Sequence, residues 1–212
     1  MLDKLRYPCY NCVRTQSLEF EMARPKSEDK RNAILDAAIV VFAERGVWST
    51  PTLAISKAAG VAEGTLFTYF STKEVLVNEL YRALKFELAD VLLAAFPQTA
   101  DVKSKFQHIW ERYVRWGVAN SEKFKVMAQL RVSDQVTAES KAVGYAPFAE
   151  LERLATEYIQ QHEICDYPVP FIAAMLGGLA ETTMAFVAQY GDTDIDYCAA
   201  GFDVFWKGIT NH

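Results

Sequence analysis

The chain has 212 residues, of which 51% are hydrophobic and 23% are charged, and its formal net charge at pH 7 is −5. This composition is typical of a globular protein with one large or two small domains, and it excludes disordered and collagen-like chains. The longest apolar run begins at Phe171 and is interrupted by Glu181, so it is shorter than the roughly 20 residues of a membrane-spanning helix, and no membrane partner is expected.

The first 21 residues show no helical period. We expect residues 1–21 to form a poorly ordered extension, or to precede the natural start at Met22, and the charged residues among them argue against a secretory signal. Cys9 and Cys12 resemble half of a zinc site, but no second pair of ligands follows at a suitable spacing. No metal and no cofactor are therefore expected. Four scattered cysteines in a chain of this length favour a reducing cytoplasm.

The excess of acidic residues is confined to one part of the chain. Residues 22–79 contain seven basic and seven acidic residues, and residues 1–21 are also balanced, so the whole deficit lies after residue 80. Excess acid repels a polyanion. Contacts with nucleic acid are therefore expected in the first third of the chain.

Two helices are predicted first in chain order. Apolar residues recur at three- and four-residue spacing from Ile34 to Phe42, which predicts a helix that ends at Gly46. Thr50 and Pro51 then give a helix-start signal, a hydroxyl cap followed by proline at the first helical position. A short helix over residues 51–59 follows, with Leu53 or Ala54 facing inward beside Ile55 and Ala58.

After Gly60, residues 64–70 can form about two turns of helix. Leu66 and Phe70, four residues apart, would face the core and leave the residues between them nearer solvent. Two short helices around a glycine turn, braced by a preceding helix, describe a helix-turn-helix unit. Residues 71–74 form a capping-box pattern that opens a longer helix, which runs to about Phe96 and stops at Pro97.

The rest of the chain reads as helical, with breaks near residues 97–100, 120, 133–137, 145–147, 166–170 and 191–193. The expected fold class is all-α, with a helix-turn-helix domain over 22–72 and a helical ligand-binding and dimerisation domain over 73–212. The helix over 171–189 is apolar almost all round. The last helix presents Phe202, Phe205, Trp206 and Ile209 on one side, so a homodimer through the last two helices is expected.

The segment AGVAEGTLFTYF over residues 59–70, followed by STKEVL, resembles the TetR/AcrR family of bacterial transcriptional regulators. The helical face around Ile34, Ala38 and Phe42 and the following Gly46 agree with it, and the resemblance spans about residues 31–80. It implies a homodimer whose two helix-turn-helix units occupy successive major grooves of a palindromic operator, about 34–36 Å apart. It also implies a repressor that a small apolar or aromatic effector releases by binding in the C-terminal domain.

The resemblance also implies which residues contact DNA. Hydroxyl, phenol and ammonium groups suit this role because they donate hydrogen bonds to phosphate oxygens. Glu63 could accept from cytosine N4, or it could only stabilise the helix N-terminus. The implied positions are Thr52, Glu63, Gly64, Thr65, Phe67, Thr68, Tyr69 and Lys73. Arg24, Lys26, Lys30 and Arg31 either add arm contacts or form a solvated basic leader.

Two residues depart from the family pattern. Phe67 stands where tyrosine is usual and lacks the hydroxyl that donates to phosphate, and Ala62 stands where serine is usual and cannot cap the helix. These departures motivate an alternative function: a helical small-molecule-binding or scaffold protein of the same fold that has lost operator binding.

Aromatic and methionine side chains in the second domain could line an effector cavity, because they give an adaptable apolar lining. At helical spacing such residues are more often ordinary core, and we expect about half of them to touch a ligand. The candidates are Trp110, Tyr113, Trp116, Phe124, Met127, Phe148 and Met175. The sequence has no nucleophile elbow, metalloprotease motif or phosphate-binding loop, so no catalytic residue is expected.

Overall fold

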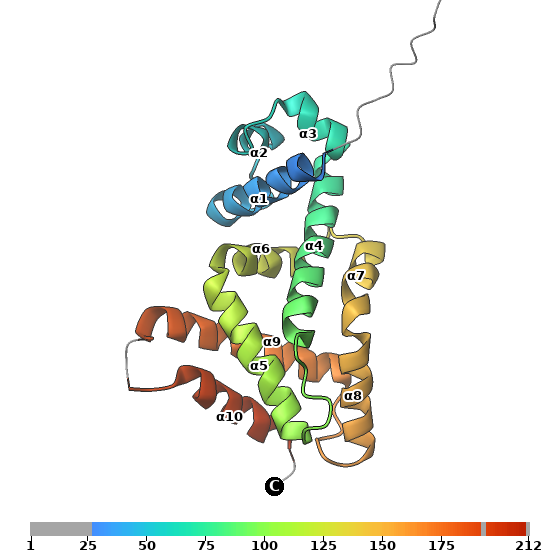
Figure 1. Ribbon diagram of the computed structural model, residues 1–212, viewed down its shortest axis with the longest axis vertical. Helices are drawn as coiled ribbons and strands as arrows, with labels where there is room; N and C mark the ends of the chain where they lie inside the picture. Colours follow the sequence, from blue (N-terminus) through green and yellow to red (C-terminus); the bar gives the residue numbers. More distant parts are fainter. Residues whose placement is uncertain (1–26, 192–193, 211–212) are drawn as a thin grey trace, which may run out of the picture.

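The computed structural model describes residues 27–191 and 194–210, and within these ranges the chain forms helices and connecting turns without strands (Figure 1). The all-α fold class is therefore confirmed. The expected extension over 1–21, with Cys9 and Cys12, and the possible arm residues Arg24 and Lys26 lie outside the described residues. The helices are α1 (Glu28–Arg45), α2 (Thr52–Ala58), α3 (Glu63–Tyr69), α4 (Lys73–Leu93), α5 (Val102–Ala119), α6 (Ser121–Arg131), α7 (Ala138–Tyr145), the 3-10 turn η1 (Ala146–Phe148), α8 (Ala149–Gln160), α9 (Val169–Tyr190) and α10 (Tyr197–Ile209).

The helix-turn-helix unit and the last two helices lie at opposite ends of the molecule. Helices α1, α2 and α3 gather at one end, and α9 and α10 lie near the other (Figure 1). Helix α4 starts beside α3 and runs into the second half of the molecule. Its 21 residues correspond to a rod about 31 Å long. One continuous helix thus connects the two regions.

Two helix starts differ from the sequence expectation. The Thr50 hydroxyl donates to the Gly46 carbonyl at 2.7 Å and does not cap α2, whose N-cap residue is Pro51. Helix α4 is capped by Thr72, whose side chain accepts from the Val75 amide at 3.2 Å, so the cap lies one residue after Ser71. Local hydrogen bonds to the backbone compete with capping, and Thr50 has found one in the preceding turn.

The helix-turn-helix end is held by a hydrophobic cluster that includes residues of α4 and α6. Phe42 of α1, and Leu66 and Phe70 at α3, are all at most 1% exposed, which confirms the prediction for the last two. Leu53 is 60% exposed, so it is Ala54 that lies on the inner side of α2; Ala58 is also exposed, against expectation. The same cluster continues through Leu76, Leu80 and Leu130, and therefore crosses residue 72 without a break.

A second hydrophobic cluster joins α5, α9 and α10. The Trp110 and Phe205 rings stack with their centroids 5.9 Å apart, and a side-chain carbon at Gly201 would lie 2.7 Å from the Trp110 ring. Phe202, Phe205 and Ile209 are at most 6% exposed. The expectation that these three residues face a partner subunit is therefore wrong: α10 turns its aromatic side inward because the glycine lets it approach Trp110 closely.

Helix α9 leaves an apolar stripe uncovered. Its length and its mean hydropathy of 1.6 over 18 residues would suffice to cross a membrane. Ala180 and Met184 pack inward, however, and the Glu181 carboxylate lies 3.7 Å from the Arg131 guanidinium, so α9 is bound into the helical domain on one side. Large side chains of its outward side are 38–50% exposed: Phe171, Met175, Phe186 and Tyr190.

Candidate functional site

The outer face of α3 is exposed to solvent. Leu66 is buried beneath it, whereas Phe67 is 42% exposed and Gly64 and Thr68 are exposed. The turn before α3 places Gly60 at φ +66°, a conformation that costs little only for glycine. The turn at Gly60 and the buried Leu66 together hold α3 with one side toward solvent.

Thr52 and Glu63 contact each other. The Thr52 hydroxyl donates to the Glu63 carboxylate at 2.9 Å, so the first turns of α2 and α3 are joined by a side-chain hydrogen bond. The carboxylate also lies in the first turn of α3, where the helix dipole favours a negative charge. This geometry orients Glu63 from within the protein, and both roles expected for it, base reading and stabilisation of the helix N-terminus, remain predictions.

Lys73 holds the loop between α1 and α2. Its ammonium group donates to the Thr50 carbonyl at 2.6 Å and to the Trp48 carbonyl at 3.3 Å. Partial burial lowers the pKa of Lys73, and the neighbouring Glu74 carboxylate opposes that shift. The expected DNA contact of Lys73 would therefore come from a group already engaged with the backbone.

Tyr69 and Thr68 also make contacts inside the unit. The Tyr69 hydroxyl accepts from the Ser27 amide at 2.9 Å, next to the start of α1, and the Thr68 hydroxyl donates to the Gly64 carbonyl at 2.9 Å. Thr65 is half-buried beside them. The structure thus gathers all eight expected DNA-contacting positions on α2, α3 and the start of α4. Of the possible arm residues, Lys30 is exposed, and Arg31 pairs with Glu79 at 2.6 Å.

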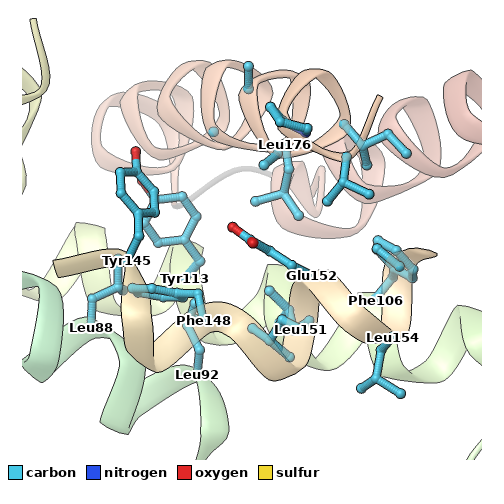
Figure 2. Close-up of a pocket in the computed structure, with 18 of the residues that line it drawn as sticks. Leu88, Leu92, Phe106, Tyr113, Tyr145, Phe148, Leu151, Glu152, Leu154 and Leu176 are labelled. Carbon is cyan, nitrogen blue, oxygen red and sulfur yellow. The ribbon is translucent and has the colours of Figure 1, made fainter. Parts of the chain in front are cut away.

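The second domain encloses a cavity of about 520 Å³ between α4, α5, α8 and α9 (Figure 2). Its volume lies within the range of about 300–1,000 Å³ of small-molecule sites. Leu88 and Leu92 of α4, Phe106 of α5, Leu151 of α8 and Leu176 of α9 supply much of the apolar lining. The cavity can therefore hold an apolar body.

Four of the expected ligand-contacting residues lie at this cavity or beside it. Tyr113 and Phe148 line it, and Figure 2 shows their rings close to Tyr145. Phe124 and Met127 line a smaller neighbouring pocket of about 60 Å³, which shares Tyr113 and Tyr145 with the large one.

Three expected residues are not on the cavity. Trp110 is fully buried and its indole nitrogen donates to the Cys198 carbonyl at 2.8 Å, while the Trp116 indole nitrogen donates to Glu87 at 3.1 Å. Both tryptophans are core residues with satisfied indole groups. Met175 faces outward on α9, where it is 38% exposed. These three placements correct the expected lining.

The cavity also carries charged groups that sequence reasoning missed. Lys85, Lys105 and Arg131 line it together with one carboxylate, Glu152, whose side chain points into the space between α8 and α9 (Figure 2). The Lys85 ammonium lies 4.1 Å from the centroid of the Tyr145 ring. Burial, aided by the nearby Arg131 charge, lowers the pKa of Lys85 to about 8.

A pattern in the sequence could have revealed Lys85. Tyr81, Lys85, Leu88 and Leu92 follow one another at spacings of four, three and four residues, so they share one face of a helix. Tyr81, Leu88 and Leu92 are at most 5% exposed. A lysine on a buried helical face is rare without a partner, and it marks this position for attention.

Helix α6 connects the cavity to the helix-turn-helix unit. Arg131, at the end of α6, lines the cavity. Two residues earlier, the Gln129 side chain accepts from the Val47 amide, just after α1, at 3.0 Å. A displacement of α6 at the cavity would therefore also displace its contact with the residue that follows α1 in the helix-turn-helix unit.

Within residues 27–191 and 194–210, no three histidine, cysteine or carboxylate side chains lie close enough to hold a metal ion. The architecture is instead a helix-turn-helix unit mounted on a helical domain with an apolar cavity, which defines a class of transcriptional regulators. Residues 34–80 of the chain match the signature of one family of this class, the bacterial regulatory proteins of the TetR family. Its relatives are transcriptional regulators and not enzymes.

Individual relatives are consistent with this match. The transcriptional repressor KstR2 of Rhodococcus jostii is 37% identical over 67 residues, a match that spans 29% of this chain and only 33% of the repressor. A putative TetR-family regulator from Shewanella sp. PV-4 superposes with a TM-score of 0.78 at 25% identity, over 86% of this chain and 99% of that one. The regulator FadR of Bacillus subtilis, solved in complex with stearoyl-CoA, shares the fold at 22% identity with a TM-score of 0.65, over 84% and 99% of the two chains.

Proposed function

We propose that the chain is a cytoplasmic, homodimeric DNA-binding repressor that a small, largely apolar effector releases from a palindromic operator. The observation that carries the proposal is the outer face of α3, where Gly64, Phe67 and Thr68 are exposed while Leu66 anchors the helix beneath them. A short helix presented in this way fits the major groove of double-stranded DNA.

The balance of charge in the first third of the chain shapes this DNA binding. Since basic and acidic residues are equal in number over 22–79, non-specific attraction to the phosphate backbone is modest. Affinity then depends on local donors such as Thr65 and on the fit of α3. Each phosphate contact by a cation still makes binding weaker as salt is added.

The proposed dimer uses the apolar stripe of α9 together with the outer side of α10. Phe171, Met175, Phe186 and Tyr190 form that stripe, and Val204 of α10 is 60% exposed. A second copy is the occupant that fits, because a twofold arrangement would cover the same stripe on both protomers and would present two α3 helices to one duplex.

The dimer can be tested by replacing Phe186 and Val204 with glutamate. This double variant would place four like charges in the interface, and we expect it to sediment as a monomer in analytical ultracentrifugation. Val132→Glu, at an apolar residue that is 77% exposed elsewhere on the surface, is the matched control and should leave the dimer intact. A wild-type protein that is monomeric at micromolar concentration would refute the dimer.

The cavity supports the effector part of the proposal. It is lined largely by leucine and aromatic side chains, and FadR of the same family was solved with stearoyl-CoA. An effector with an extended apolar body is consistent with both. It would lower DNA affinity only by binding more tightly to the state of the dimer that does not fit DNA, and α6 is placed to connect the two.

Operator binding can be measured by fluorescence anisotropy on the DNA that flanks the coding region of this chain. We expect saturable, salt-sensitive binding to an inverted repeat. Thr65→Val should weaken binding to all sequences alike, whereas Glu63→Ala should change the preference among bases if Glu63 reads a base. Unchanged preference in Glu63→Ala would limit that residue to the contact with Thr52.

The alternative function, a protein of this fold that has lost operator binding, is favoured by two observations. Lys73 and Glu63 are both engaged inside the helix-turn-helix unit, and Phe67 offers no donor to phosphate. Absence of saturable binding at micromolar protein, with the dimer and the cavity intact, would establish this alternative over repression.

A further inference from the structure

Within the described part of the chain, Lys85 has no anionic partner. Among the described residues, no carboxylate oxygen lies within 4.0 Å of its ammonium group, which instead lies over the faces of the Tyr145 and Phe148 rings, 4.1 and 4.9 Å from their centroids. The side chain is half-buried. A positive charge removed from water without a counter-ion is costly, so this site favours an added anion.

The other charges of the cavity already have partners or lie apart from Lys85. Arg131 faces the Glu181 carboxylate at 3.7 Å, and Lys105 donates to the Tyr158 hydroxyl at 2.8 Å. Of the residues that the structure describes, Glu152 is the only carboxylate on the lining of the large cavity, and it is exposed. Three cations face Glu152 on the lining and Glu181 beside Arg131, so the cavity keeps an excess of positive charge in a chain whose net charge is −5.

The approach of α7 to α4 fixes Lys85 in this position. A side-chain carbon at Gly144 would lie 2.8 Å from the Tyr81 ring and 3.2 Å from the Lys85 stem. The glycine therefore lets α7 bring Tyr145 over the ammonium group. Lys85 also stands one helical turn before Leu88, so the charged group adjoins the apolar lining along α4.

We propose that the effector cavity selects amphipathic organic anions, with the anionic head group paired to Lys85 beside Tyr145 and Phe148 and the apolar chain lying along Leu88 and Leu92 toward Leu176. This assignment rests on the proposed effector role of the cavity and adds the charge of the ligand to it. A head group at Lys85 would also lie near Arg131, at the end of α6, and would therefore act on the helix that contacts the helix-turn-helix unit.

Three probes with the same ten-carbon chain test the assignment: decanoate, decyl phosphate and decan-1-ol. We expect isothermal titration calorimetry to give at least tenfold tighter binding of an anion than of the alcohol to the wild-type protein. Lys85→Met should remove this preference and leave the alcohol affinity within about twofold. Lys85→Arg, which keeps the charge, should retain the preference. Glu152→Gln, which removes the carboxylate of the same cavity, should retain or increase it.

The order of the two anions identifies the head group, since tighter decanoate points to a carboxylate and tighter decyl phosphate to a phosphate. Equal affinity for all three probes, or a preference that survives in Lys85→Met, would overturn the assignment. Operator release separates it from the proposed function. Anion-selective binding that leaves DNA affinity unchanged contradicts the effector role alone, whereas release by all three probes without preference contradicts the head-group assignment alone.

Discussion

The two ends of the molecule differ in how far their polar groups are paired and their apolar surface is covered within one protomer. At the helix-turn-helix end, seven-residue helices are too short to be stable alone. Hydrogen bonds donated by Thr52 and Lys73, and one that Gln129 accepts from the Val47 amide, hold these helices and the loop before α2 over a closed core. The second domain has long helices, yet it leaves a cavity, an unpaired Lys85 and an uncovered stripe on α9. One end is complete in the protomer, whereas the other would gain stability from molecules that fill or cover it.

This difference suggests how the two ends respond to partners. A unit whose polar groups are already satisfied can dock on DNA as a rigid body, and its contacts depend on where it is held. A domain with an open cavity and an uncovered apolar face changes stability with whatever fills them. Regulation is therefore expected to originate in the second domain and to reach the first through α4 and α6.

The largest expected effect tests the closed core of the helix-turn-helix end. Phe70→Ala removes a ring that is 1% exposed and should lower the free energy of unfolding by about 3–5 kcal/mol, because a cavity replaces it. The Phe67 side chain, three residues earlier, is 42% exposed. Phe67→Ala should therefore lower the free energy of unfolding by less than about 1 kcal/mol. Urea unfolding measures both. Comparable losses of unfolding free energy in the two variants would show that the outer face of α3 is packed against the protein and is not exposed to solvent.

An intermediate effect tests the incomplete cavity. The pKa of Lys85 is lowered to about 8 from its ordinary 10.5, so the unfolded chain binds more protons between these pH values and wild-type stability rises with pH across that window. Lys85→Met should raise the free energy of unfolding by about 1–2 kcal/mol at pH 7, discounted for partial exposure. This gain should shrink as pH rises from 8 to 10.5.

The neighbours of Lys85 bear on the origin of this pH dependence. Burial raises the pKa values of Tyr81 and Tyr113 to about 12, so both stay neutral across the window. The Arg131–Glu181 pair and Tyr145 complete the surroundings on α6, α9 and α7. Lys105→Met, at a lysine that already donates to Tyr158, is the control, and an equal gain there would show that the effect is not specific to Lys85.

The smallest expected effect concerns the connection between the two ends. Gln129→Ala leaves the Val47 amide without its 3.0 Å partner and should lower the free energy of unfolding by about 1 kcal/mol. It should also reduce the change in DNA affinity caused by an effector. Gln107→Ala, which removes an exposed contact with Glu111, should change both by much less. An undiminished effector response in Gln129→Ala would place the connection in α4 alone.

Most of the fold was predictable because periodic burial leaves a strong pattern. The spacing of Leu66 and Phe70 placed both in the core, and glycine and proline positions located the breaks between helices. The direction in which α10 faces was not predictable. A pattern such as Phe202, Phe205 and Ile209 defines an apolar side, but whether a protomer or its partner covers that side depends on distant residues such as Trp110 and Gly201.

The cavity was harder to predict than the fold. Large aromatic residues at helical spacing indicate burial, and the best packed of them, Trp110 and Trp116, fill space instead of surrounding it. A cavity arises where side chains fail to meet, which one helix does not encode. Lys85 could have been found, since a charge interrupts an otherwise apolar face there. The assignments of Thr65 and Glu63 to DNA remain predictions.

The continuous core beneath α3 bears on protein engineering. Leu76, Leu80 and Leu130 belong to the same buried cluster as Phe42 and Phe70, so a chimera that inherits only the first 72 residues would lack part of that cluster. Transplanting a new operator specificity into this scaffold would require either the start of α4 and much of α6 as well, or the exchange of outward side chains of α3 alone. The second route disturbs fewer buried contacts and would keep the original cavity.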